Sequence, residues 1–267
     1  MAASALAARE IVTKLAAVEG LARDWRMGAL PSGDAHALDP DRLKALLEPG
    51  RPARPHLVGA QDLPRRRGMS TASRIALIHA LAHIEFNAIN LALDCIARFP
   101  DFPQDYYNDW VRVAEEEALH FGLLRQQLQN RGADYGDLPA HDALWEMACR
   151  THKDALARMA LVPRVLEARG LDAAPVIIEK LQRLGEADLV TVMEIILRDE
   201  EFHVAVGDRW FRHLCRGRGL DAGAEYLRLV LAFNAPWPAA PINLAARRRA
   251  GFSDAELKIL SGPRPQA

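Results

Sequence analysis

The feature that most limits what this chain can fold into is a Glu-x-x-His motif that occurs twice within apolar, helix-forming sequence. Glu117 and His120 lie in VAEEEALHFGLL, and Glu200 and His203 lie in LRDEEFHVAVG. Residues three apart on an α-helix share one face, about 5 to 6 Å apart, so each pair can reach a single point. Because ionised carboxylates are costly to bury unless they are paired or bind a metal, the pattern favours two core helices that carry metal ligands.

Two further glutamates extend the motif into an internal duplication. Glu85 lies in AHIEFNAINLAL and Glu167 in MALVPRVLEARG, each on an apolar helical stripe. They are 82 residues apart, and both members of the Glu-x-x-His motif recur after 83 residues. The sequence therefore repeats a carboxylate followed by Glu-x-x-His, one copy in each of two predicted helical hairpins. Two such hairpins facing one another would bring four carboxylates and two imidazoles together, the ligand set of ferritin-like di-iron and di-manganese proteins.

The predicted metal ligands are Glu85, Glu117, His120, Glu167, Glu200 and His203. The two motif glutamates are expected to lie between the metals, and the two glutamates that precede them are expected to be terminal ligands. Glu167 follows Pro163 in the same predicted helix, so its position along the helix axis is hard to infer. If Glu167 is not a ligand, Glu179 or Glu194 would replace it.

The ligand types also indicate the metal. Carboxylate oxygens suit hard or borderline divalent cations, and imidazole suits iron. Four carboxylates balance two divalent ions, and bridging carboxylates would hold the ions about 3.5 to 4 Å apart. We therefore expect two divalent metal ions, with iron favoured and manganese or a mixed Mn/Fe pair as alternatives. Two other interpretations stay open: exposed Glu–His pairs, and a buried network of Glu–His hydrogen bonds without metal.

Helical periodicity along the rest of the chain predicts an all-α protein, a four-helix bundle with extra N- and C-terminal helices. The ligand set is that of a ferritin-like four-helix bundle. The four bundle helices are expected at about 71–98, 105–131, 141–170 and 187–216, with a kink at Pro163. Shorter helices are expected at about 4–25, 40–48, 175–184, 221–233 and 253–261.

Three segments follow from this pattern. Residues 1–67 form a helical extension with a Pro- and Arg-rich connector, residues 68–218 form the di-metal bundle, and residues 219–267 form a helical tail packed on the bundle. The arginine runs 65–67 and 247–249 are expected to be solvated rather than to bind a ligand.

The net charge and the cysteine content limit the expected cellular location and the expected partners. The net charge is −1, which gives no overall attraction to nucleic acid or membrane. Three widely spaced cysteines fit neither a disulfide framework nor a zinc cluster, and they favour a reducing compartment. The sequence shows no signal-peptide pattern and no apolar run of about 20 residues. We therefore expect a cytoplasmic protein without a membrane or nucleic-acid partner, and a homodimer is left open.

Several residues near the ligands have predicted roles. Glu116, Asp199 and Asp94 are candidates to hold the ligand histidines through the second ring nitrogen, with a solvated position as the alternative. Arg158 and Arg164 are expected to pair with acidic neighbours rather than to bind an anionic substrate. The apolar shell that shares the ligands' stripes is expected to be buried; it comprises Ile89, Phe121, Leu124, Met193, Ile196 and Val204.

Long stretches of the chain also look like a known family. They are HIEFNAINLALD, YYNDWVRVAEEEALHF, YGDLPAH, ARMALVPRVLEARGLD, LRDEEFHVAVGDRWF and PINLAARRRAGF. Over about residues 70–260 they resemble the ferritin-like domain family of unknown function DUF455. The resemblance implies a ferritin-like bundle with its metal positions on the six predicted ligands, and it implies no substrate. The LEAR sequence around Glu167 is also similar, more distantly, to the third-helix motif of di-iron tRNA hydroxylases.

Three functions compete on this basis. The leading one is an oxidoreductase that activates O2 at a di-iron centre to oxidise a small-molecule substrate, with an unknown electron donor. The second is a ferroxidase or metal-storage protein, which is disfavoured because about 70 residues before the bundle and about 50 after it would obstruct packing into a cage. The third is an interaction module that the metal stabilises.

Overall fold

The computed structural model describes residues 1–28, 44, 46–63 and 70–265. The described residues contain helices, turns and a single isolated parallel bridge between Leu57 and Ala140, without a β-strand. The predicted all-α class is confirmed. The chain divides into two compact units, residues 1–149 and 150–267, which are described one at a time.

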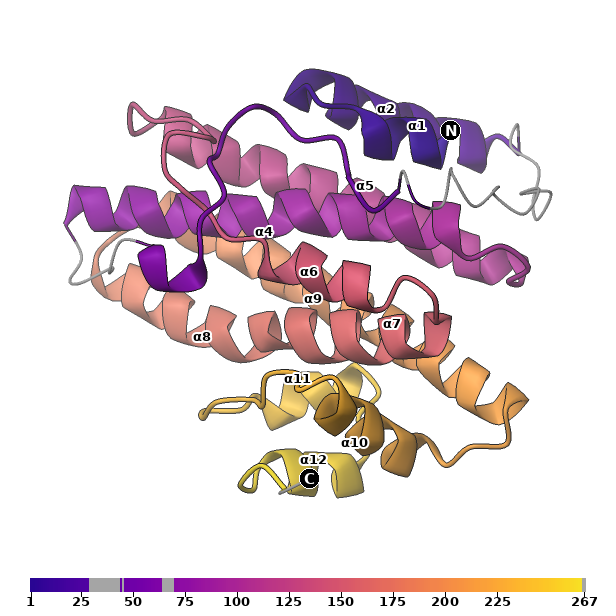
Figure 1. The fold of residues 1–267 in the computed structure, drawn as a ribbon. Helices are drawn as coiled ribbons and strands as arrows, with labels where there is room; N and C mark the ends of the chain where they lie inside the picture. Colours follow the sequence, from indigo (N-terminus) through magenta and orange to yellow (C-terminus); the bar gives the residue numbers. More distant parts are fainter. Residues whose placement is uncertain (29–43, 45, 64–69, 266–267) are drawn as a thin grey trace. The chain divides into compact units, whose positions relative to one another are not determined.

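The first unit is built on a long helical hairpin. Its elements are α1 (Ala2–Ala7), α2 (Ile11–Arg26), η1 (Ala60–Asp62), α4 (Thr71–Arg98), α5 (Gln104–Gln129) and α6 (Ala143–Arg150). Helices α4 and α5 pack along their length, α1 packs on α4, and α2 packs on α5 (Figure 1).

The sequence explains where the α4–α5 hairpin begins and turns. The side chain of Ser70 caps α4 by accepting a hydrogen bond from the N–H of Ser73 at 3.2 Å. Pro100 and Pro103 flank the turn, where a helix cannot continue. Across the hairpin, the rings of Phe86 and Phe121 meet edge to face with centroids 5.3 Å apart. These contacts fix the register of the two helices.

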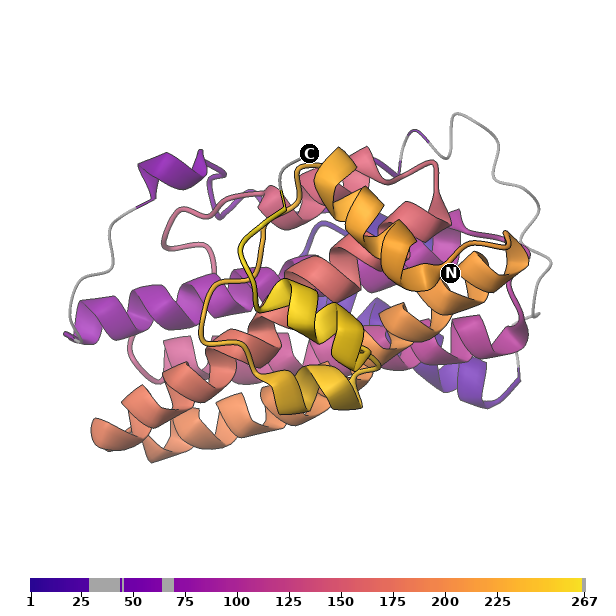
Figure 2. The same cartoon turned by 90° about the horizontal axis from the view of Figure 1, so that it is seen from below.

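The second unit contains a second hairpin and a C-terminal layer. Its elements are α7 (Ala155–Leu161), the π-helical segment η2 (Val162–Glu167), α8 (Ala168–Arg183), α9 (Ala187–Gly217), α10 (Ala222–Ala232), α11 (Leu244–Arg249) and α12 (Asp254–Leu260). The continuous arm α7–η2–α8 packs along α9 (Figure 1). Helices α10 and α11 pack on this hairpin, and α12 packs on α11 (Figure 2).

The α7–η2–α8 arm changes helix type at Pro163, where the sequence predicts a kink. Pro163 has no N–H to donate, so the regular α-helical ladder is interrupted there. The N–H of Ala168 instead donates to the carbonyl of Pro163, five residues back, as in a π-helix. The sequence predicted an irregularity at Pro163 and did not predict its π-helical form.

Three predicted helices have wrong boundaries, and one helix was not predicted. The helix expected at 141–170 is broken between α6 and α7, where Asp154 caps a new helix start. The helix expected at 175–184 begins earlier, at Ala168. The helix expected at 4–25 is two helices, and α11 was not expected. Most of the short helix expected at 40–48, and the arginine run 65–67, lie outside the described residues.

Helix α4 is long and apolar enough to cross a membrane by length and composition alone. In the structure, 67% of its apolar window is buried, as in the core helix of a soluble protein. The window's apolar character therefore reflects packing in the core of the first unit.

Candidate metal centre

The first unit brings three of the predicted ligands together; they are called the first half-site. Glu85 comes from the middle of α4, and Glu117 and His120 come from α5. All three are buried, with exposed fractions of 4%, 0% and 0%. Their ligand atoms lie within 4.8 Å of one another. Nδ1 of His120 lies 3.6 Å from Oε2 of Glu85 and 3.6 Å from Oε2 of Glu117.

These separations fit ligands of one ion better than direct hydrogen bonds. An N–H···O hydrogen bond spans about 2.7 to 3.2 Å, which is shorter than either His120 contact. A divalent ion at roughly 2.0 to 2.2 Å from its ligands keeps neighbouring ligand atoms roughly 3 to 3.5 Å apart. The imidazole nitrogen and the two carboxylates of the first half-site are therefore spaced for a metal to lie among them.

The pKa values of Glu85 and His120 indicate that the first half-site requires positive charge. Burial, together with the neighbouring carboxylate of Glu117, raises the pKa of Glu85 well above its usual value. Burial alone would lower the pKa of His120, but Glu117 and Glu85 outweigh it and raise that pKa to about 11. With no metal bound, protons thus supply the positive charge that two buried carboxylates require. A divalent cation would supply the same charge and displace those protons.

The second unit holds the other three predicted ligands, called the second half-site. Glu200 and His203 lie on α9, and Glu167 is the last residue of η2. All three are buried, with exposed fractions of 8%, 0% and 8% for Glu200, His203 and Glu167. Nδ1 of His203 lies 3.5 Å from Oε1 of Glu200, which repeats the spacing of the first half-site.

The register of the second hairpin places Glu167 beside this pair. Gly185, with φ of 71°, forms the turn between α8 and α9. Pro163 packs directly on Gly207, where an added Cβ would lie 2.2 Å from the proline Cγ. Both residues are 22 positions from Gly185, and Glu167 and His203 are both 18 positions from it. In an antiparallel hairpin, Glu167 is therefore level with His203, one turn from the Pro163–Gly207 contact.

All six predicted ligands are buried, and that they bind metal stays a prediction. The two alternatives to Glu167, Glu179 and Glu194, are solvent-exposed. The apolar shell is also confirmed: Ile89, Phe121, Leu124, Met193, Ile196 and Val204 are at most 4% exposed.

The neighbours proposed to hold the histidines have arginine partners. Arg112 pairs with Glu116 at 2.8 Å, Arg198 pairs with Asp199 at 2.8 Å, and Arg98 pairs with Asp94 at 2.6 Å. These ion pairs orient the three carboxylates. That the carboxylates also accept hydrogen bonds from the ligand histidines stays a prediction.

One prediction about the arginines is wrong and another is confirmed. Arg247 was expected to be solvated, but it is 2% exposed and pairs with Asp172 at 2.6 Å. The tertiary contact was invisible in sequence because Asp172 lies 75 residues away. Arg164 pairs with Glu256 at 2.6 Å, as expected of an arginine with an acidic partner.

A cavity of about 120 Å³ in the first unit was not anticipated. His83 and Asn87 line it on α4, and Nδ1 of His83 lies 2.9 Å from the Tyr135 hydroxyl. Burial lowers the pKa of His83 to about 4, so the ring is neutral at physiological pH. His83 and Asn87 are each two positions from Glu85, about 200° around the helix, so the cavity lies on a different face of α4 from the first half-site.

Comparison with known proteins identifies a family but no activity. A family described as "Protein of unknown function (DUF455)" matches residues 7–258. An uncharacterized protein of Haemophilus influenzae is 45% identical over 213 residues, which are 77% of this chain and 74% of the relative. No solved structure matches the chain. The function is therefore inferred from the two half-sites.

Proposed function

The chain belongs to the DUF455 family of proteins of unknown function, and we propose that it is a ferritin-like dinuclear metal protein that acts as an O2-activating oxidoreductase. In this proposal the two hairpins, α4–α5 and the α7–η2–α8 arm with α9, form one four-helix bundle. The first and second half-sites then supply the ligands of two divalent ions, most favourably iron.

The observation that carries the proposal is the repeated spacing of the two half-sites. Each has a fully buried histidine with Nδ1 3.5 to 3.6 Å from a carboxylate oxygen three residues earlier. Such a pair costs free energy in a low-dielectric core unless a cation compensates it. One buried pair could be a structural feature, but two copies at a constant sequence separation favour a common ligand.

The residue roles follow from charge and position. Four carboxylates balance two divalent ions, so the loaded site would be near neutral. Glu117 and Glu200 each share a helix face with a ligand histidine, which suits them to lie between the ions. Glu85 and Glu167 would each bind one ion from the facing helix. When bound, an iron pair would supply electrons for reduction of O2, while the buried shell excludes water.

The expected partners and location follow the same proposal. A small-molecule substrate and an electron donor would be needed for turnover. None of the three cysteines, Cys95, Cys149 and Cys215, is in a disulfide, which fits the reducing environment of the cytoplasm.

The test starts from protein purified without added metal, stripped with chelator, and loaded anaerobically with Fe²⁺. We expect two irons per chain, and O2 uptake with an optical change on exposure to air. Glu117→Ala is the control that should lose both the full iron content and the O2 uptake. Accumulation of many irons per chain would instead indicate ferroxidase or storage activity, and bound iron without O2 uptake would indicate a metal-stabilised module. A chain that binds neither Fe²⁺ nor Mn²⁺ would contradict the proposal.

A further inference from the structure

A buried arginine in the second unit lies at the centre of an aromatic cage. Arg164 is 0% exposed, and its Cζ lies 4.1 Å from the ring centroid of Tyr226. The rings of Phe252 and Phe211 are 4.6 and 4.8 Å away. At these distances each ring face attracts the guanidinium charge. The cage therefore holds a planar cation in one orientation.

Two acidic residues complete the surroundings of Arg164. Its Nη2 donates to Oε1 of Glu256 at 2.6 Å, and its Nε lies 3.0 Å from Oδ1 of Asp208. Arg212 also pairs with both acids, at 2.8 Å to Asp208 and 2.7 Å to Glu256. Glu256 in turn caps α12 in a capping box with Ser253. The C-terminal helix is thus connected to Arg164 through a charged network.

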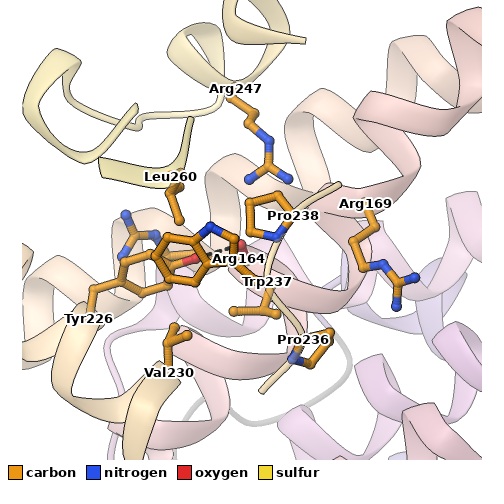
Figure 3. Close-up of a pocket in the computed structure, with 10 residues that line it drawn as sticks. Arg164, Arg169, Tyr226, Val230, Pro236, Trp237, Pro238, Arg247 and Leu260 are labelled. Atoms are coloured by element: carbon orange, nitrogen blue, oxygen red, sulfur yellow. Dashed lines mark hydrogen bonds between the residues drawn. The ribbon is translucent and has the colours of Figure 1, made fainter. Parts of the chain in front are cut away.

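The position of Arg164 along the chain links this network to the second half-site. Arg164 lies in η2, three residues before Glu167. The Tyr226 hydroxyl donates to the Arg164 carbonyl at 3.2 Å (Figure 3). A π-helical turn closes through i→i+5 hydrogen bonds in place of the α-helical ladder. In this turn both the side chain and the carbonyl of Arg164 are held by other residues.

A second set of contacts fixes the backbone on the C-terminal side of Glu167. Arg247 of α11 donates from Nη2 to the carbonyl of Ala168 at 3.2 Å, and it pairs with Asp172 one turn later. The residues three before and one after Glu167 are therefore both fixed by side chains from the C-terminal layer. Four residues of the C-terminal layer contact Arg164 or the backbone beside Glu167. We call them the C-terminal clamp; they are Tyr226, Arg247, Phe252 and Glu256.

We propose that Arg164, held by the C-terminal clamp, is the positioning residue that sets the metal ligand Glu167 at the second half-site. This inference rests on the proposed dinuclear site. It assigns the C-terminal layer a role in metal binding, through the backbone of η2 and without contact with the ion. Glu85, by contrast, lies inside an unbroken α-helix whose own hydrogen bonds fix its position.

A ligand-binding role for the same region is disfavoured by its size. The pocket beside Arg164, lined also by Tyr226 and Trp237, has a volume of about 10 Å³ (Figure 3). That is room for about one water molecule, so the side chains of the protein themselves fill the space.

The test titrates the metal-free full chain with Co²⁺ alone and follows both the affinity and the visible absorption of the bound ion. The variant is Arg164→Met, which keeps an unbranched side chain, removes the guanidinium and leaves Arg212 to pair with both acids. Arg51→Met in the first unit is the matched control, because Arg51 also pairs with a partly buried carboxylate, that of Asp142, at 2.6 Å. Tyr226→Phe removes only the hydrogen bond to the Arg164 carbonyl and serves if Arg164→Met does not fold.

The wild-type chain should bind two Co²⁺. Arg164→Met should bind one with wild-type affinity and the other at least tenfold more weakly, with an altered spectrum. Arg164→Lys should recover part of this loss, and Tyr226→Phe should shift affinity in the same direction by less. Arg51→Met should lower the melting temperature and leave both affinities and the spectrum unchanged.

Two results would overturn the inference in different ways. If Arg164→Met, or Tyr226→Phe where the first does not fold, binds both ions with wild-type affinity and spectrum, the positioning role is wrong and the dinuclear site stands. If the wild-type chain binds no Co²⁺, the proposed function fails, and the positioning role fails with it.

Discussion

Glu85 lies in the interior of α4, a regular helix of 28 residues, whereas Glu167 is the last residue of a six-residue π-helical segment. Their partners are closely alike: His120 and His203 both lie three residues after a glutamate on a long α-helix. The two half-sites therefore share their Glu-x-x-His helices and differ in the helix that brings the remaining carboxylate.

The difference shows two ways to hold a carboxylate in a helical core. In the first unit, the backbone hydrogen bonds of α4 and the packing of Phe86 on Phe121 are sufficient. In the second unit, Pro163 breaks the ladder, and contacts from α10 to α12 replace the lost support. Under the proposed function, an irregular segment that carries a metal ligand needs more of the chain to fix it, and the C-terminal layer supplies these contacts.

The largest expected effect is loss of metal when either motif glutamate is removed. Glu117→Ala and Glu200→Ala should each reduce bound metal to at most one ion per chain, because each would lie between the two ions. Since binding to the native state alone stabilises it by about 4 kcal/mol at a thousandfold excess over Kd, the melting temperature should also fall. Metal per chain and melting with and without chelator measure both effects.

Neighbouring glutamates provide matched controls for these variants. Glu115 pairs with Arg26 at the surface at 2.6 Å, and Glu201 pairs with Arg249. Glu115→Ala and Glu201→Ala should keep full metal content and change stability by less than about 1 kcal/mol. Equal metal loss in the controls would show that the effect is not specific to the half-sites.

A second prediction compares the two half-sites by substituting one glycine in each hairpin. In Gly207→Ala the new Cβ would meet Pro163 at 2.2 Å and push η2 away from α9. We expect a loss of roughly 1 to 3 kcal/mol in the free energy of unfolding and weaker binding of one ion. Gly122→Ala, on α5, meets nothing within 4 Å and should stabilise the chain by about 0.5 to 1 kcal/mol.

Chemical denaturation and Co²⁺ titration of the two glycine variants provide the measurement. Both substitutions add a single methyl group near a ligand histidine, so the comparison isolates the close approach of Pro163. A Gly207→Ala variant as stable as wild type would contradict the register that places Glu167 level with His203.

A third prediction concerns acid and the C-terminal clamp. Burial would raise the pKa of Glu256, but Arg164 and Ser253 outweigh it and lower the pKa from 4.5 to about 2. A lowered pKa contributes stability above pH 4.5, and this contribution is lost as the pH falls toward 2. Glu256→Gln should therefore be less stable than wild type at pH 6, and the difference should shrink as pH falls below 4.5. A difference that stays constant from pH 6 to 3, measured in chelator, would refute this.

The smallest expected effect is the release of protons when metal binds. His120 has a pKa of about 11 through Glu117 and Glu85, so it carries a proton at pH 7 that a metal must displace. Calorimetric titration in two buffers of different ionisation enthalpy should report at least about one proton released per chain. His120→Gln should release fewer, and equal heats in both buffers for the wild type would contradict the charge assignment.

The sequence predicted the burial of Glu85, Glu117 and Glu200 because helical periodicity is local. The stripes that carry these glutamates continue for several turns of regular helix, and the structure buries all three. It did not predict the break between α6 and α7, because the capping residue Asp154 resembles many solvent-exposed acids.

The misplacement of Arg247 has a different cause. A run of three arginines favours a solvated face, but only Arg248 and Arg249 are exposed. Arg247 is buried because Asp172, on a helix far away in sequence, neutralises it. Pairings of this kind depend on tertiary structure, and periodicity carries no information about them.

The most direct test of the central claim is the metal content of the wild-type chain, purified without added metal and measured by elemental analysis after loading with Fe²⁺ under anaerobic conditions. We predict two ions per chain in the wild type and at most one in Glu200→Ala. Two ions per chain in Glu200→Ala, or none in the wild type, would contradict the proposed dinuclear centre.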